Sequence, residues 1–466
     1  MIGSLFLLIF PFTYILSGIY ALRGVIKNEY PALLTFFVFG LPIYITALSI
    51  LHLYGWDFLI PYFQYSKEVL IFFALLLLFY RIKEMPTWNW LDKLMLVYFI
   101  YTGIFILVPI GGFDMVQRIV AFKNISLFPL LYLLGRLITI DSFQISRFQK
   151  QVMLLAVAAS ILLVGEVLLD THLQSIIGYA SFNEKYFSFD PAGNFGLSWT
   201  FEIAGGVKRF ASFFANPLEH GASTLITLAV LASIFANPSK NTEHGFFFVT
   251  LIGAGLSILF ALSRASLVGF VLSSYLLFRV LQQKKILIYY RLVFFLLVII
   301  VGVVSIDSTI ADFAFDTLQF NDSSSLSHLL EWVNGMEAMV SNPFGMGLGE
   351  SGRVAGEWGL NTGGENQFII LGVQCGFPAM ILYILIIGVV IFQAAHLIRH
   401  RVGLPAIIGT LVFVIKVGLI IPLLTSAAES YLYVSYTGWF LTGLLSTLYS
   451  SIHDSQPALV ERLNTK

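Results

Sequence analysis

The chain has 466 residues, of which 58% are hydrophobic and 11% charged, and its formal net charge is zero. A soluble protein would carry about a quarter of charged residues, so this composition excludes a soluble globular protein and indicates a multi-span membrane protein. The balanced charge argues against a nucleic-acid-binding surface. The single cysteine, Cys375, excludes an intrachain disulfide framework and a cysteine-based metal cluster.

Apolar runs of about 17 to 25 residues, broken by polar clusters, predict an all-α polytopic membrane protein with about 12–14 transmembrane helices. The first run has no basic residue before it and no cleavage site after it, so we expect a span there rather than a removable signal. The spans are predicted near Ser4–Leu22, Pro31–Leu53, Val69–Tyr80, Leu91–Ile110, Ile119–Ile138, Val152–Leu169, Leu218–Ala236, Phe246–Leu262, Ser266–Leu281, Leu292–Ile306, Phe368–Leu397, Pro405–Leu424 and Tyr431–Tyr449.

Two longer polar stretches interrupt these spans. The predicted regions are N-terminal spans in 1–169, a loop in 170–217, central spans in 218–306, a large loop in 307–366, C-terminal spans in 367–451 and a tail in 452–466. Within the large loop, apolar spacing predicts an amphipathic helix over His328–Val340, which Asn342-Pro343 should end. A loop of this length is usually functional or disordered, and its aromatic residues favour function.

The distribution of lysine and arginine predicts the orientation in the membrane. Seventeen of the 26 basic residues fall in one set of alternate loops and eight in the other, and Lys416 lies inside a span. Because basic residues concentrate in cytoplasmic loops, we expect the N-terminus outside, the C-terminus inside and both long loops on the outer face. No internal repeat is visible, so a transporter built from inverted repeats gains no support.

The string Gly347-Leu348-Gly349-Glu350-Ser351-Gly352 fits a GxGxxG pattern. A nucleotide site would need this pattern between a strand and a helix of a βαβ unit, which is lacking here. A tightly turning connection is the favoured interpretation. No His, Asp and Glu set has metal-ligand spacing, and no Ser, His and Asp order indicates a hydrolase, so neither a metal nor a cofactor is predicted.

Three basic residues are candidates for binding an anion. Arg209 lies where the loop 170–217 returns to the membrane, and Arg264 lies at a tight reversal between two apolar runs. A guanidinium group can bind two phosphate oxygens at once, but arginines at span ends also reach to lipid headgroups. Lys416, within a span, either needs a buried partner or extends outward.

Glu365 stands one step before a span, at the end of the large loop. It could act as a base at the membrane surface or only complement the dipole of the following helix. His328 and His220 are the other titratable candidates near the outer surface, and lone histidines there are more often structural than catalytic.

The order of short motifs from Lys208 to Leu385 resembles the O-antigen ligase/polymerase family. The residues that carry the resemblance are Arg209, Asn216-Pro217, Ser263-Arg264, His328, Trp332, Asn342 to Gly349, Glu365-Asn366-Gln367 and Gly376. The family implies a metal-independent, inverting glycosyltransferase on the outer face of the bacterial inner membrane. The implied donor is an oligosaccharide on undecaprenyl pyrophosphate, and the acceptor is another lipid-linked repeat or a lipid A-core sugar.

By this resemblance, Arg209 and Arg264 would bind the pyrophosphate, with Lys416 as a third charge. Glu365 would be the base, and His328 and Trp332 would line the acceptor cleft. Ligases of the family are similar in placing a His where this chain has Glu365, and many relatives place an Arg at His328. We therefore expect a polymerase of O-antigen or exopolysaccharide repeats. Its expected partners are the surrounding membrane lipids and a chain-length regulator, which such polymerases can have. An O-antigen ligase, a protein O-oligosaccharyltransferase and, from another class, a polysaccharide or lipid transporter stay as alternatives.

Overall fold

The computed structural model describes residues 6–139, 143–188, 191–203, 206–236, 244–304, 323–352, 355–356 and 362–464. Within these ranges eight helices are long and apolar enough to cross a membrane. Two further helices, Met115–Ser126 and Phe128–Leu137, are apolar enough only when taken together and bend by 50° where they meet, as in a broken span or a re-entrant loop. The predicted fold class, an all-α polytopic membrane protein, is confirmed.

The N-terminal part of the bundle contains straight helices and broken ones. Its elements are α2 (Ile9–Ile26), α3 (Ala32–Phe39), η1 (Leu41–Ile43), α4 (Tyr44–Leu53), η2 (Asp57–Leu59), α5 (Ile60–Arg81), α6 (Trp90–Leu107), α7 (Met115–Ser126), α8 (Phe128–Leu137) and α9 (Ile145–Leu168). Pro42, within the short η1, lies where the second span changes from α3 to α4. Pro129 follows the bend between α7 and α8. Proline lacks a backbone N–H, which explains why both spans break at these points.

The segment after α9 leaves the bundle and folds into short elements before α12. These are α10 (Leu173–Ile176), α11 (Tyr179–Phe187), η4 (Trp199–Phe201) and a small antiparallel hairpin of β1 (Glu202–Ile203) and β2 (Val207–Lys208), in which Glu202 pairs with Lys208. The remaining elements are α12 (Pro217–Ala236), α13 (His244–Ala261), α14 (Arg264–Val280), α15 (Lys284–Val304), α17 (Ser323–Ser341), α19 (Gln367–His400), α20 (Leu404–Gly418), α21 (Ile420–Thr425), η5 (Ala428–Ser430) and α22 (Leu432–Asn464).

Each of the thirteen predicted spans overlaps a helix or a helix pair, but the third was predicted too short. The run Val69–Tyr80 is the end of α5, which begins at Ile60 and includes Lys67 and Glu68. The two side chains form an ion pair of 3.3 Å, and Lys123 of α7 lies 3.1 Å from the same carboxylate. Because opposite charges neutralise one another here, the helix tolerates them. Lys67, counted above among the eight basic residues of the outer loops, lies within α5 instead.

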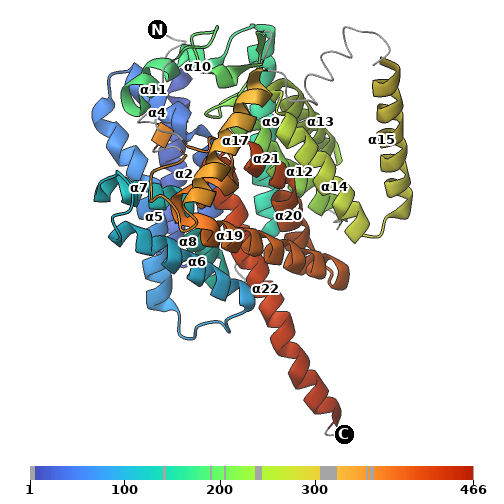
Figure 1. Cartoon of the computed structure of the whole chain (residues 1–466). Helices are drawn as coiled ribbons and strands as arrows, with labels where there is room; N and C mark the ends of the chain where they lie inside the picture. Colours follow the sequence, from blue (N-terminus) through green and yellow to red (C-terminus); the bar gives the residue numbers. More distant parts are fainter. Residues whose placement is uncertain are drawn as a thin grey trace.

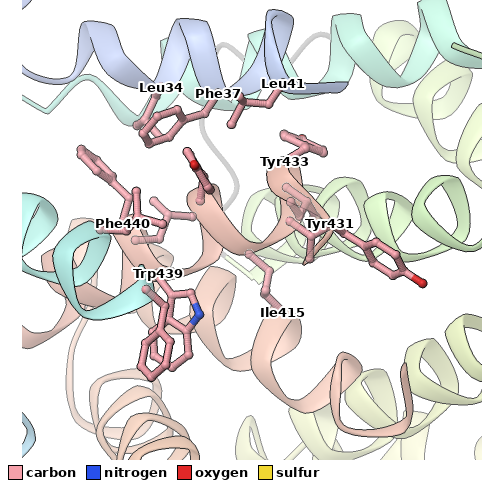
Figure 2. Close-up of a cluster of buried hydrophobic side chains, with 14 of the residues drawn as sticks. Leu34, Phe37, Leu41, Ile415, Tyr431, Tyr433, Trp439 and Phe440 are labelled. Atoms are coloured by element: carbon pink, nitrogen blue, oxygen red, sulfur yellow. The ribbon is translucent and has the colours of Figure 1, made fainter. Parts of the chain in front are cut away.

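The centre of the bundle is an aromatic cluster around α22. The ring of Trp439 stacks on Phe128 of α8 with centroids 4.5 Å apart, and Phe440 meets Phe37 of α3 edge to face. Figure 2 shows how these side chains from α3, α20 and α22 gather, with Tyr431 at the edge of the group. Gly135 of α8 lets the two backbones approach, because a Cβ there would collide with the backbone carbonyl of Phe440.

The chain ends lie at opposite ends of the molecule (Figure 1). The N-terminus lies at the top of that view beside α10 and α11, and α22 leaves the bundle at the bottom. The segment that leads into α12 lies beside α10, since Gln174 donates to the carbonyls of Ser212 and Phe214. The α13–α14 reversal, the start of α19 and the start of α22 come to the same place, because Arg264, Glu365 and Tyr431 all act electrostatically on Arg209. This end, called the loop end below, carries the predicted site.

Candidate functional site

The segment that contains Arg209 is fixed by a buried carboxylate at the end of α9. Glu166 accepts hydrogen bonds from the backbone N–H of Leu173 and of Ser212, each at 2.8 Å. The Ser212 hydroxyl then donates to the carbonyl of Ala159 at 2.9 Å. A buried carboxylate is stable only where donors satisfy it, and these two amides do so. Glu166 is therefore an anchor for the segment that leads from Arg209 into α12.

Arg209 reaches across to the end of α13. Its Nε donates to the carbonyl of Ala261 and its Nη2 to that of Leu262, both at 3.2 Å. These carbonyls lie at the C-terminus of the helix, where a cation is favoured by the helix dipole. The pKa of the Arg209 guanidinium is lowered to about 10, chiefly by burial and also by the charge of Arg264, while Tyr431 and Glu365 act in the opposite direction. At neutral pH the side chain is charged.

Arg264 is the first residue of α14, and the turn before it is unusually tight. Only Leu262 and Ser263 separate α13 from α14, and Leu262 adopts a positive φ of 47°. Ser263 caps the new helix by accepting a hydrogen bond from the backbone N–H of Ser266. The Arg264 side chain is exposed at the loop end. Its charge is near enough to affect that of Arg209, so the structure brings these two predicted residues together.

Glu365 reaches the same place from a third part of the chain. Its turn ends at Asn366, whose side chain accepts hydrogen bonds from the backbone N–H groups of Phe368 and Ile369 and so begins α19. The half-buried Glu365 acts electrostatically on both Arg209 and Tyr431. A predicted base and two predicted anion-binding residues, far apart in sequence, thus share one site.

The turn before α19 is held in place by α17. A Cβ on Gly335 of α17 would collide with the Ile369 side chain and lie 2.6 Å from the Cα of Gly363. Gly363 and Gly364 have positive φ angles of 83° and 60°, which a residue with a side chain adopts only at a cost. The close approach of these glycines sets the position of the next residue, Glu365. The amphipathic helix predicted over His328–Val340 is confirmed and extends from Ser323 to Ser341.

Two residues of the site were not predicted from the sequence. Tyr431, just before α22, acts electrostatically on Glu365, Glu219 and Arg209 and forms a hydrogen bond with Ser426. Glu219 is a carboxylate in the first turn of α12, and only 7% of it is exposed. A signal existed for both: each follows a short polar interruption, Asn216-Pro217 or Ser426 to Ser430, directly beside an apolar span.

The GxGxxG string is not a phosphate cradle. The backbone N–H groups of Met346 and Gly347 donate to the carbonyls of Val373 and Gln374, at 2.7 and 3.1 Å. These carbonyls are free of the helix ladder because α19 kinks at Gly376, where φ is 79°. The Gln374 side chain bonds the next part of the string. A phosphate would need those N–H groups itself, so the string serves as the tight connection that the sequence favoured.

Lys416 does not join the two arginines. It is 2% exposed within α20, and its Nζ lies 3.1 Å from the centroid of the Trp439 ring. Glu429 interacts with it electrostatically and also accepts hydrogen bonds from the indole of Trp439 at 2.9 and 3.0 Å. The ammonium thus belongs to the aromatic core rather than to the loop-end site, and its predicted role as a third phosphate-binding charge gains nothing from this position.

Trp332 and His328, the residues predicted to line an acceptor cleft, both belong to α17. Trp332 packs with Met339, Ile369 and Val373 where α17 meets α19, and its buried indole Nε1 has no hydrogen-bond partner in the part of the chain that the structure describes. The backbone of His328 belongs to α17, but its side chain lies outside the described residues. His220, the other histidine considered, is buried and stacks on Phe214 with ring centroids 5.0 Å apart. Burial and stacking favour a structural role for His220.

Beside Arg209, a second cation is occupied elsewhere. Lys208 forms an ion pair of 2.7 Å with Asp170 and lies near His172, which is 2% exposed and whose ring nitrogens have no hydrogen-bond partner among the described residues. Burial lowers the pKa of His172 to about 4, with a further lowering by Lys208 and an opposing effect of Asp170. Of the two consecutive basic residues, only Arg209 faces the predicted site.

The site therefore combines two guanidinium groups, two carboxylates and a tyrosine hydroxyl. The arginines can hold a doubly charged phosphate group, and Glu365 can accept a proton beside it. Among the described residues, no group of three or more His, Cys, Asp or Glu side chains is arranged to hold a metal ion. No family model matches the chain, and no curated protein is similar to it in sequence.

Proposed function

We propose that this protein is a bacterial inner-membrane glycosyltransferase that polymerises oligosaccharide repeats carried on undecaprenyl pyrophosphate, for an O-antigen or exopolysaccharide. The observation that supports it most is the convergence of Arg209, Arg264 and Glu365 at one end of the bundle. These residues come from three separate parts of the chain. Charges that served only to keep the protein soluble or to complement a helix dipole would not need to lie together.

In the proposed reaction, a hydroxyl of the acceptor sugar attacks the anomeric carbon of the donor. The bond from that carbon to the pyrophosphate oxygen breaks, and its electron pair leaves with the polyprenyl pyrophosphate. Glu365 accepts the proton of the attacking hydroxyl. The configuration at the anomeric carbon inverts because attack and departure occur on opposite faces.

The arginines would act where negative charge develops. The pyrophosphate gains charge as the bond breaks, and fixed guanidinium groups in a poorly hydrated site stabilise that charge strongly. Arg209 is already held by two carbonyls and needs little reorganisation. A guanidinium also favours the ionised form of a neighbouring carboxylate, which keeps Glu365 able to accept a proton.

The proposed location rests on the charge asymmetry of the loops. The loop end carries both long loops, and most basic residues of the sequence fall in the connections at the other end. By the positive-inside rule, the site then faces the extracytoplasmic side, where lipid-linked repeats are joined. Ligases of the family are similar in having a histidine at the position where this chain has Glu365. The carboxylate therefore favours a polymerase over a ligase.

The test is chain extension by the purified protein with a lipid-linked repeat as both donor and acceptor. Arg264→Ala should abolish the ladder of longer products, and Glu365→Gln should do the same. Arg264 is exposed at the first position of α14, where alanine is well tolerated, so the fold should persist. Full extension by either folded variant would refute the assignment. Transfer of a single repeat to a lipid A-core acceptor, without extension, would favour the ligase.

A further inference from the structure

The end of the bundle opposite the Arg209 site holds a separate polar cavity of about 280 Å³. Tyr20 of α2, Glu29 and Thr35 at the start of α3, and Arg147 and Gln151 at the start of α9 are among the residues that line it. Helix α9 runs from this cavity to Glu166 at the loop end. The volume lies near the lower limit for pockets that bind small molecules, which suits a compact polar group.

One side of the cavity is a partly used guanidinium. Arg147 donates from Nη2 to the hydroxyl of Tyr20 at 2.6 Å, and its guanidinium carbon lies 5.3 Å from the centroid of that ring. In the described part of the chain it has no other hydrogen-bond or ion-pair partner. An arginine has five N–H donors in a planar fork, so Tyr20 orients this exposed guanidinium and leaves donors for a ligand in the cavity that Arg147 lines. That arrangement fits a phosphate.

The cavity lining also carries a negative charge. Glu29 lines the same cavity and is exposed, and within the described ranges its carboxylate pairs with neither Arg147 nor another cation. Between the two, the Gln151 amide donates to the Thr35 hydroxyl at 2.9 Å, which leaves this part of the wall neutral. A guanidinium and a carboxylate that face one cavity without pairing match a ligand with a phosphate and an ammonium.

The surroundings of the cavity point to a lipid. On α3, the residues Pro31, Thr35 and Phe39 form a half-buried stripe at helical spacing that leads away from it along the bundle. Leu16 on α2 and Leu154 on α9 lie further along the helices that flank this stripe, and they are 64% and 54% exposed. Apolar side chains exposed on spans face acyl chains, so a headgroup in the cavity could have its tails on this surface.

We propose that this cavity binds the headgroup of an aminophospholipid, with its phosphate on Arg147 and its ammonium on Glu29. The acyl chains lie on the outer surface of α2, α3 and α9. The ligand differs from the substrate of the proposed reaction, and the site is separated from it by the length of α9. The lipid-binding proposal and the glycosyltransferase assignment can therefore be tested separately, and the failure of one does not affect the other.

The test is lipid retention by the full-length protein, purified in detergent and measured by native mass spectrometry. Phosphatidylethanolamine, phosphatidylglycerol and soluble glycerophosphoethanolamine are added separately at equal concentrations. The wild type should retain phosphatidylethanolamine about tenfold better than phosphatidylglycerol, as expected for one charge-assisted hydrogen bond. Glu29→Gln should remove this preference, and Arg147→Gln should weaken retention of both lipids. Glu84→Gln, an exposed carboxylate at the same end, should change nothing.

Two results would overturn the proposal. Equal retention of both lipids by the wild type and by Glu29→Gln would exclude the ammonium site. Binding of soluble glycerophosphoethanolamine as tight as that of the lipid would exclude the lipid and assign the same chemistry to a soluble ligand. Because Tyr20→Phe removes only the hydroxyl that orients Arg147, reduced retention by this variant supports the phosphate site even if Arg147→Gln proves unstable.

Discussion

Replacing Glu166 by glutamine should loosen the segment that positions Arg209. In the wild type each carboxylate oxygen accepts one backbone N–H, from Leu173 or from Ser212, at 2.8 Å. The amide of glutamine offers one acceptor and one donor, so one of the two bonds is lost and an N–H donor is left facing another. A hydrogen bond to a charged group contributes about 1.5–3 kcal/mol, so opening of this segment should become roughly 10- to 150-fold more frequent.

Amide hydrogen exchange measures this opening directly, because exchange reports the free energy of local opening. Peptides that contain Leu173 or Ser212 should exchange faster in Glu166→Gln by about that factor. Glu184→Gln, an exposed carboxylate of α11, serves as the control and should leave the same peptides unchanged. Unchanged exchange at both amides in Glu166→Gln would refute the anchoring role. Faster exchange throughout the protein would also contradict it, since the loss should be local.

Three further predictions concern other parts of the structure. The pKa of His172 is lowered to about 4, so between pH 6.5 and 4 the unfolded chain binds a proton that the folded chain does not. The free energy of unfolding should therefore fall by about 3 kcal/mol as the pH is lowered through this window. In His172→Phe, thermal unfolding should lack this pH-dependent loss of stability. Gly335→Ala should destabilise the contact of α17 with Gly363 by about 1–3 kcal/mol, seen as faster proteolysis of the loop after α17, whereas no such change is expected for Glu337→Gln at an exposed position of the same helix. Lys416→Met should lower thermal stability, because it removes the cation over Trp439, but should cost less donor affinity than Arg209→Ala; equal losses would show that Lys416 binds the donor.

Much of the fold could be predicted from the sequence because hydrophobic length decides it. Runs of apolar residues locate the spans, and apolar spacing together with Asn342-Pro343 locates the amphipathic helix α17. The beginning of α5 could not be found in this way. Lys67 and Glu68 look like loop residues in the sequence, and only their pairing with Lys123 from another helix shows why a span includes them.

The site was predictable only in part. Arg209, Arg264 and Glu365 stand out because each is a charge at the end of an apolar run, but their proximity depends on helix packing that no local pattern encodes. Tyr431 and Glu219 were missed for the same reason, since a tyrosine and a first-turn glutamate are ordinary at span ends. Lys416 is the opposite case: a charge within a span looks functional in the sequence, and the structure places its ammonium over the Trp439 ring.

The central claim is that Arg209 and Arg264 bind the pyrophosphate of a lipid-linked donor. The most direct measurement is the affinity of the purified protein for undecaprenyl pyrophosphate, compared between Arg209→Ala and Lys208→Ala. The two residues are consecutive, but the ammonium of Lys208 pairs with Asp170 at 2.7 Å and only Arg209 faces the site. The account predicts at least about a tenfold loss of affinity in Arg209→Ala, as expected for a charge-assisted pair, and little change in Lys208→Ala. Equal affinities in the wild type and in folded Arg209→Ala would contradict it.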